Sequence, residues 1–160
     1  MNNYSLLKLS ILAILLFALT PFSWGATDCN AVTEISKTEC QALLDLYNST
    51  DGPNWSNKSG WNETDTPCSW FGITCNNGRL TDLFLEKNGL NGTLPNSLGN
   101  LSNLTYLNLS PNNITGSIPE SLGNLSNLTV LHLYSNNIIG SIPESLGNLS
   151  QSHSFCQSDR

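Results

Sequence analysis

Hydrophobic residues recur at a fixed spacing in the second half of the chain. Three blocks align without gaps, and they begin at Leu80, Leu104 and Leu128, 24 residues apart. Each block contains an L-x-L segment in which apolar and variable positions alternate, the period of a β-strand with one buried face. One such coil cannot bury its own leucines, so the repetition predicts stacked coils that share an interior.

The remainder of each block predicts how the coil closes. An asparagine follows the strand in all three copies, at Asn88, Asn112 and Asn136. A short amide side chain can satisfy backbone groups where the chain turns away, so we expect an asparagine ladder. A Leu-Pro or Ile-Pro pair then favours a second extended segment, because the residue before proline disfavours helix. The apolar positions that should close each coil are Leu90, Leu98, Leu101, Ile114, Leu122, Leu125, Ile138, Leu146 and Leu149.

The segment before the repeats, residues 26–79, has a different pattern. Cys40, Leu43, Leu44 and Tyr47 would share one face of a helix. Its start stays open, because both SKTE from Ser36 and TECQ two residues later fit a capping box. The large aromatic residues that follow are Trp55, Trp61, Trp70 and Phe71. They could form a carbohydrate platform, but a small core that needs bulky side chains is the favoured interpretation.

Both parts resemble one family. The pattern LxxLxLxxNxLxGxIPxxLGNLxx, from Leu80 to Gln151, resembles the plant-type leucine-rich repeat, with GTLP in place of GSIP in the first copy. The preceding ECQALLDLYN…W…GW…CSWFGITC resembles the N-terminal cap of such repeats. This resemblance implies an α/β solenoid. Its features would be a right-handed leucine-rich-repeat superhelix, parallel β-strands on the concave face and an N-terminal helix/hairpin disulfide cap.

The cysteines point to an oxidising compartment. Cys29, Cys40, Cys68 and Cys75 allow three pairings. We favour Cys68–Cys75, which closes a short loop, together with Cys29–Cys40, and leave the role of Cys156 open. A zinc site is disfavoured because no second cysteine pair or histidine has a suitable spacing. No metal and no cofactor are therefore expected.

The two ends of the chain carry further expectations. Lys8 precedes an apolar run and small residues, so residues 1–25 are predicted to be a signal peptide cleaved before Ala26. An uncleaved anchor is the alternative, although the run is short for about 30 Å of hydrocarbon. Residues 152–160 lack the repeat pattern. We expect them to be disordered or truncated, with Leu146 and Leu149 poorly covered and with lateral stacking through the uncapped C-terminal end.

The predicted concave face offers a candidate binding surface. Variable side chains alternate with the buried leucines there, and the sheet should align Phe84, Asn108 and His132 in one row. Such variation on one face suits recognition, and this interpretation is favoured over an unselected solvated face. The candidate ligand-binding residues are Asp82, Phe84, Glu86, Tyr106, Asn108, Val130, His132 and Tyr134.

Charge and composition exclude other classes of function. Only six residues are Lys or Arg and the net charge is −6, so a nucleic-acid partner is not expected. His132 has no carboxylate in its row and no catalytic motif is present, so the chain should not be an enzyme. We expect a secreted or cell-surface module, periplasmic or on the outer surface if bacterial, without a membrane span. Its partner would be an extracellular protein, peptide or glycan. The alternatives are a wall-associated structural or adhesive spacer and a non-functional N-terminal fragment of a longer leucine-rich-repeat receptor.

Overall fold

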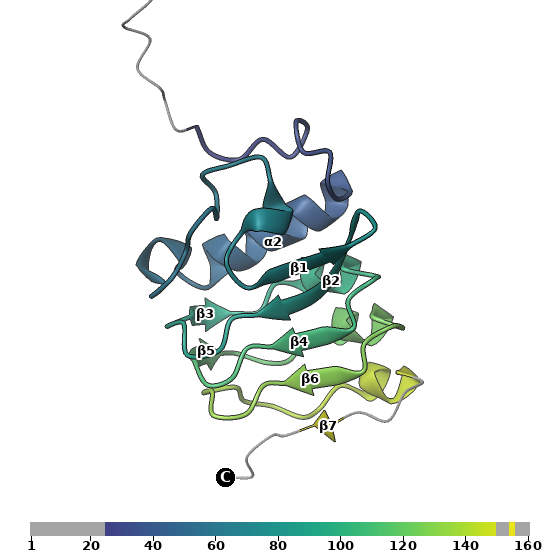
Figure 1. The fold of residues 1–160 in the computed structure, drawn as a ribbon. Helices are drawn as coiled ribbons and strands as arrows, with labels where there is room; N and C mark the ends of the chain where they lie inside the picture. Colours follow the sequence, from purple (N-terminus) through teal and green to yellow (C-terminus); the bar gives the residue numbers. More distant parts are fainter. Residues whose placement is uncertain (1–24, 150–153, 156–160) are drawn as a thin grey trace, which may run out of the picture.

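The computed structural model describes residues 25–149 and the backbone of residues 154–155. It shows a short solenoid in which a cap with one long helix lies against three stacked coils (Figure 1). Most of the predicted signal peptide, residues 150–153 and residues 156–160, including Cys156, lie outside the described residues.

The main sheet runs through the cap and all three coils. It has the order β1-β2-β4-β6-β7. Its strands are β1 (Ile73–Asn76), β2 (Arg79–Phe84), β4 (Tyr106–Asn108), β6 (Val130–His132) and β7 (Ser154–Phe155). The first two form an antiparallel hairpin, and all later pairs are parallel. The cap hairpin therefore pairs with the outer edge of β2 and supplies β1 as the first strand of the sheet.

Strand β7 differs from the expectation for the tail. Its two residues were predicted to lie in an unpatterned segment, yet their backbone pairs with β6. Ser154 aligns with Val130 and Phe155 with Leu131, which continues the 24-residue spacing of the coils. Residues 152–160 lack the leucines of the repeat pattern, and the strand position aligned with Leu131 is occupied by phenylalanine. The backbone register, and not the identity of the residue, carries the repeat here.

The opposite side of the solenoid is made of shorter elements. A second sheet pairs β3 (Asn91–Thr93) with β5 (Asn113–Thr115) in parallel. These strands lie just before the Leu-Pro and Ile-Pro pairs, where an extended segment was predicted. Three 3-10 helices then close the coils, η3 (Asn96–Asn100), η4 (Glu120–Asn124) and η5 (Glu144–Asn148). Gly99 permits the close stacking of η3 on η4, because an added β-carbon there would overlap the carbonyl oxygen of Ser121.

The shared interior is formed by the leucines of all three coils. The strand leucines of the first two coils are fully buried, and those of the third are nearly so. Leu146 and Leu149 were expected to be poorly covered, and this is wrong, since both are buried within the coil that η5 closes. Exposure appears instead at Ile142, which is 52% exposed although its equivalent Ile118 is buried. No further described coil packs over Ile142.

The asparagine ladder is confirmed. The Asn112 side chain accepts the backbone N–H of Asn88 at 3.0 Å and that of Leu90 at 3.1 Å. Its amide donates to the carbonyl oxygens of Leu85 and Leu109, at 2.8 and 2.9 Å. Asn136 links the second and third coils in the same way. Each asparagine therefore joins its own turn to the preceding coil.

The first rung of the ladder reaches into the cap, which the sequence did not reveal. Asn88 accepts the N–H of Asn57 at 2.7 Å and donates to its carbonyl oxygen at 2.9 Å. Asn57 thus occupies the place that a preceding coil would take. The cap and repeats are joined by backbone hydrogen bonds as well as by apolar contact.

The cap is built on helix α2 (Lys37–Ser49) and two disulfides. Ser36 is the N-cap and forms a capping box with Glu39, so the first of the two predicted starts is correct. The bonds Cys29–Cys40 and Cys68–Cys75 are present, as favoured from the sequence. Short 3-10 helices, η1 (Gly52–Asn54) and η2 (Pro67–Ser69), complete the loops. Cys29–Cys40 ties the start of the cap to helix α2, and Cys68–Cys75 ties η2 to strand β1.

The tryptophans form the core of the cap. The rings of Tyr47, Trp55, Trp61 and Trp70 contact one another, with centroid separations of 4.9 to 6.2 Å. Trp61 is fully buried, and its indole N–H donates to the carbonyl oxygen of Phe71. Phe71 itself was grouped with this core and is 37% exposed, so that part of the interpretation is wrong. Because the tryptophan faces are buried against one another, they are not open to a sugar ring.

Candidate ligand-binding surface

The eight candidate residues lie on one face of the main sheet or at its strand ends. Asp82, Tyr106 and Val130 are register partners on β2, β4 and β6. Phe84, Asn108 and His132 are partners in the next row, as predicted. Glu86 and Tyr134 follow β2 and β6, each two residues after the last residue of its strand. Each coil thus contributes one variable residue to each row, and the stacking of the coils places these residues side by side.

Four rings join into a continuous band across the three repeat strands, here called the aromatic stripe: Phe84, Tyr106, His132 and Tyr134. Phe84 and Tyr106 lie 4.8 Å apart between ring centroids. Tyr106 and His132 lie 5.6 Å apart, and His132 and Tyr134 lie 5.7 Å apart, both edge to face. All four side chains are half-buried, so each presents part of its ring to solvent. These separations lie within the range of favourable aromatic pairs.

The aromatic stripe does not follow the predicted rows. Phe84 contacts Tyr106, which belongs to the neighbouring row, and the Tyr106 hydroxyl reaches the Nδ1 atom of His132 at 3.5 Å. Large rings reach diagonal neighbours on a sheet, whereas alignment from the sequence identifies only direct partners. The 24-residue alignment therefore identified the residues of the aromatic stripe but not the diagonal contacts between them.

Polar groups flank the aromatic stripe. The Asp82 carboxylate accepts the hydroxyls of Thr81 and Thr105, at 2.9 and 3.0 Å. Beyond the other end of β2, the Asn108 amide donates to Glu86 at 3.5 Å. The sequence predicted that these carboxylates lie on this face, but it did not predict the hydrogen bonds from the two threonines to Asp82. Asp82 is consequently held in position, while Glu86 is exposed.

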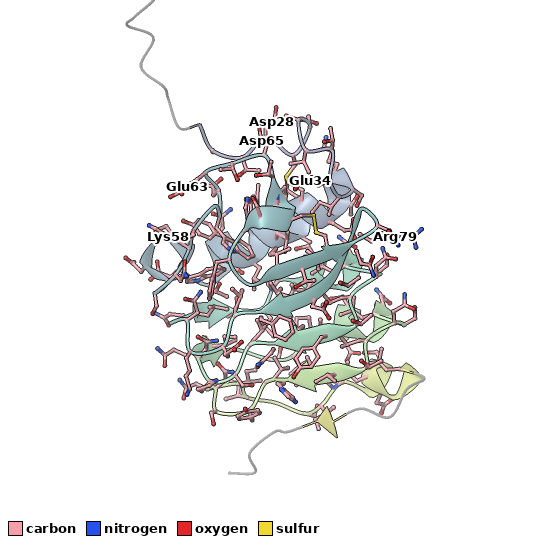
Figure 2. The ribbon with its side chains drawn as sticks, viewed as in Figure 1. Asp28, Glu34, Lys58, Glu63, Asp65 and Arg79 are labelled. Atoms are coloured by element: carbon pink, nitrogen blue, oxygen red, sulfur yellow. A yellow bond between two sulfur atoms is a disulfide. The ribbon has the colours of Figure 1, made fainter. Side chains whose placement is uncertain are left out.

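A shallow polar hollow of about 500 Å³ lies beside the start of the strands. It is lined by Asn76, Asn77, Arg79, Thr81, Asn103 and Asn127. Figure 2 shows Arg79 at the end of the β1–β2 hairpin, at the edge of the sheet. These residues come from the cap hairpin and from turns that precede β4 and β6, so no single motif in the sequence marks them as neighbours.

The described residues contain no group of three or more histidine, cysteine or acidic side chains that could hold a metal ion. Within the same residues, no helix is both long enough and apolar enough to cross a membrane. The chemistry that the surface offers is contact through aromatic rings, amides and two carboxylates.

Two family models match consecutive parts of the chain. The model described as "Leucine rich repeat N-terminal domain" matches residues 36–76, and "Leucine rich repeat" matches residues 78–151. Among individual proteins, the leucine-rich repeat receptor protein kinase EMS1 of Arabidopsis thaliana is 33% identical over 91 residues. That match covers 56% of this chain and 7% of the kinase. The chain spans 7 to 13% of the length of the first three curated relatives that it matches.

Solved structures of plant receptor ectodomains are similar to this chain. The ectodomain of the Arabidopsis receptor kinase HAESA, in complex with an N-terminal extended IDA peptide hormone ligand, matches with a TM-score of 0.62 and 30% identity. The match covers 72% of this chain and 20% of HAESA. The ectodomain of the Arabidopsis receptor kinase SOBIR1 matches with a TM-score of 0.60 and 27% identity, over 74% of this chain and 68% of that chain. The similarity includes both the cap and the repeats.

Proposed function

Because this chain belongs to the leucine-rich-repeat family and has a cap and repeats of the plant type, we propose that it is a non-catalytic recognition module outside the cell. Its ligand would be an extracellular protein, peptide or glycan that binds the concave face of the main sheet. The observation that carries this proposal is the aromatic stripe. It is continuous across three coils, at positions that vary while the inward leucines repeat.

The composition of the face supports binding. Half-buried aromatic side chains with polar tips contribute large contact area and are frequent at the energetic centres of interfaces. Here they are flanked by groups that can orient a ligand through hydrogen bonds, at Asp82, Glu86 and Asn108. The similar HAESA ectodomain was solved with a peptide hormone, which is consistent with recognition by this fold.

A spacer is the weaker candidate. Neighbouring strands lie about 4.8 Å apart, so the step from β2 to β6 covers only about 10 Å. A structural spacer has to separate its two ends by a large distance, and these three strands span only a short one. The partly exposed aromatic stripe would also have no role in a spacer and would favour nonspecific association.

Capture by the oxidised protein tests the proposal. We expect immobilised protein to retain a specific component of the extracellular fraction of its source, and the double variant Tyr106→Ala and Tyr134→Ala to retain at least about tenfold less, as for residues at the centre of an interface. The matched control is Thr115→Ala with Asn113→Ala, which alters exposed side chains of the second sheet and should leave capture unchanged. Circular dichroism should show both variants folded. Retention that is equal for all three proteins would contradict binding through the aromatic stripe.

A further inference from the structure

We propose that Phe84, flanked by the carboxylates of Asp82 and Glu86, forms a binding site for an arginine side chain of an extended peptide. The proposal rests on the concave face being the recognition surface and names the chemistry of what binds there. It is carried by three features of the described residues, namely an accessible ring pair, two carboxylates that flank Phe84 along the chain, and the scarcity of positive charge on that face.

The ring pair offers a surface on which a guanidinium can stack. Phe84 and Tyr106 are 4.8 Å apart and inclined by 37°, and both remain half-buried. Packing against each other and against the sheet holds them in place. Arginine stacks on aromatic faces because its planar cation is weakly hydrated and is attracted to the π-electrons. A preformed pair of rings loses little conformational entropy when it binds such a group.

The carboxylates lie on either side of that ring along the chain. Asp82 and Phe84 are two residues apart on β2, so both side chains point to the same face of the sheet. The hydroxyls of Thr81 and Thr105 each donate to one oxygen of Asp82. Glu86 follows in the turn and accepts from Asn108, the register partner of Phe84. A carboxylate has about four acceptor positions, so both groups keep capacity for a guanidinium fork.

Positive charge is scarce on this face. The eight surface residues include two carboxylates and neither lysine nor arginine. Among the described residues, the cations next to this face along the chain are Lys87, exposed in the turn after Glu86, and Arg79, at the hairpin end of β2 (Figure 2). The whole chain carries a net charge of −6, which favours the approach of a cationic ligand. The carboxylates would repel an acidic glycan, and they would accept hydrogen bonds from a neutral glycan but attract no charge on it. Charge complementarity therefore favours a basic peptide.

Paired peptides that differ only in the charge of one side chain test this site. The probes are acetylated and amidated Gly-Arg-Gly-Tyr and its citrulline counterpart, which keeps the shape of arginine without the charge. We expect the arginine peptide to shift the NMR signals of the Phe84 and Tyr106 rings. We also expect it to bind at least about fivefold more tightly than the citrulline peptide, since hydrogen bonds between charged groups are about twice as strong as neutral ones.

Two variants at neighbouring positions should affect the affinity for the arginine peptide differently. Glu86→Gln removes one carboxylate charge with almost no change of shape and should weaken binding of the arginine peptide about threefold to tenfold. Lys87→Gln, the matched control at the next position, removes a repulsive cation and should leave binding unchanged or tighten it. Neither side chain is buried, so both variants should fold.

Equal affinity for the two peptides would overturn the arginine site, and so would shifts confined to acidic residues of the cap such as Asp28, Glu34 and Asp65. Those carboxylates lie at the top of Figure 2, on the cap rather than on the repeat strands. The arginine site can fail while the proposed function stands. In that case Tyr106→Ala with Tyr134→Ala abolishes capture of the natural ligand, but Glu86→Gln leaves binding of the arginine peptide unaltered.

Discussion

Asn112→Ala should lower the free energy of unfolding by about 3 kcal/mol, because unsatisfied backbone groups in a protein interior cost about 1 to 3 kcal/mol each. The substitution removes four hydrogen bonds at once. It leaves the N–H groups of Asn88 and Leu90 and the carbonyl groups of Leu85 and Leu109 without this partner. Water can reach part of the site, since Asn112 is half-buried, so the loss should be smaller than the sum of four full penalties.

Urea unfolding of the oxidised protein, followed by circular dichroism, measures this loss. The adjacent Asn113→Ala is the matched control, since it removes the same amide from an exposed position on β5 and should cost less than about 1 kcal/mol. Equal stability of the two variants would show that the ladder does not join the coils.

Trp61→Ala should destabilise the cap by about 3 to 5 kcal/mol, the range for removing a large buried aromatic side chain. The indole is fully buried and contacts the rings of Tyr47, Trp55 and Trp70. Its loss would also leave the carbonyl oxygen of Phe71 without the indole N–H. The effect should spread to the first coil, because the cap supplies both the β1 partner of β2 and the first rung of the ladder.

Tryptophan fluorescence and urea unfolding of the purified variant test the cap core. Phe71→Ala is the control, since that ring comes from the same segment but is partly exposed, and it should cost about 1 kcal/mol or less. If both variants lost equal stability, the buried ring cluster would not be the principal core of the cap.

The periodic part of the fold was predictable because the same short pattern of apolar and polar residues recurs in every coil and has the same structural consequence each time. Leucines spaced as L-x-L can bury one face only if the coils stack, and the asparagine after each strand must satisfy the turn. The register of Phe84 with Asn108 and His132 follows directly from the 24-residue spacing. Spacing also carried the pairing Cys68–Cys75, because the two residues close a short loop.

Features that depend on contacts between distant segments were not predictable. Asn57 has no motif that marks it as the first rung of the ladder, since its partner Asn88 lies 31 residues away. Phe71 has the side chain of a typical core residue, yet it is 37% exposed while the adjacent Trp70 is buried, a difference that depends on how the loop before β1 folds. Phe155 was not expected in a strand, because the repeat has leucine at this position and only the backbone register repeats there.

The candidate site was predictable as a set of residues but not as a surface. The alignment named all four rings of the aromatic stripe. Their diagonal order, from Phe84 through Tyr106 to His132 and Tyr134, depends on how large side chains reach across the sheet. The hydrogen bonds from the Thr81 and Thr105 hydroxyls to Asp82 likewise depend on how neighbouring side chains turn toward each other, which the alignment does not show.

Amide hydrogen exchange of the oxidised protein, resolved by NMR, tests most directly whether the 24-residue blocks form stacked coils with one interior. The N–H of Leu85 donates to Asn108, that of Leu109 to His132 and that of Thr105 to Thr81, each across neighbouring coils. We expect these three amides to exchange at least about a hundredfold more slowly than in an unstructured peptide, as for hydrogen bonds that open only with the core. Exchange at the unstructured rate for all three, in protein with both disulfides intact, would contradict the stacked solenoid.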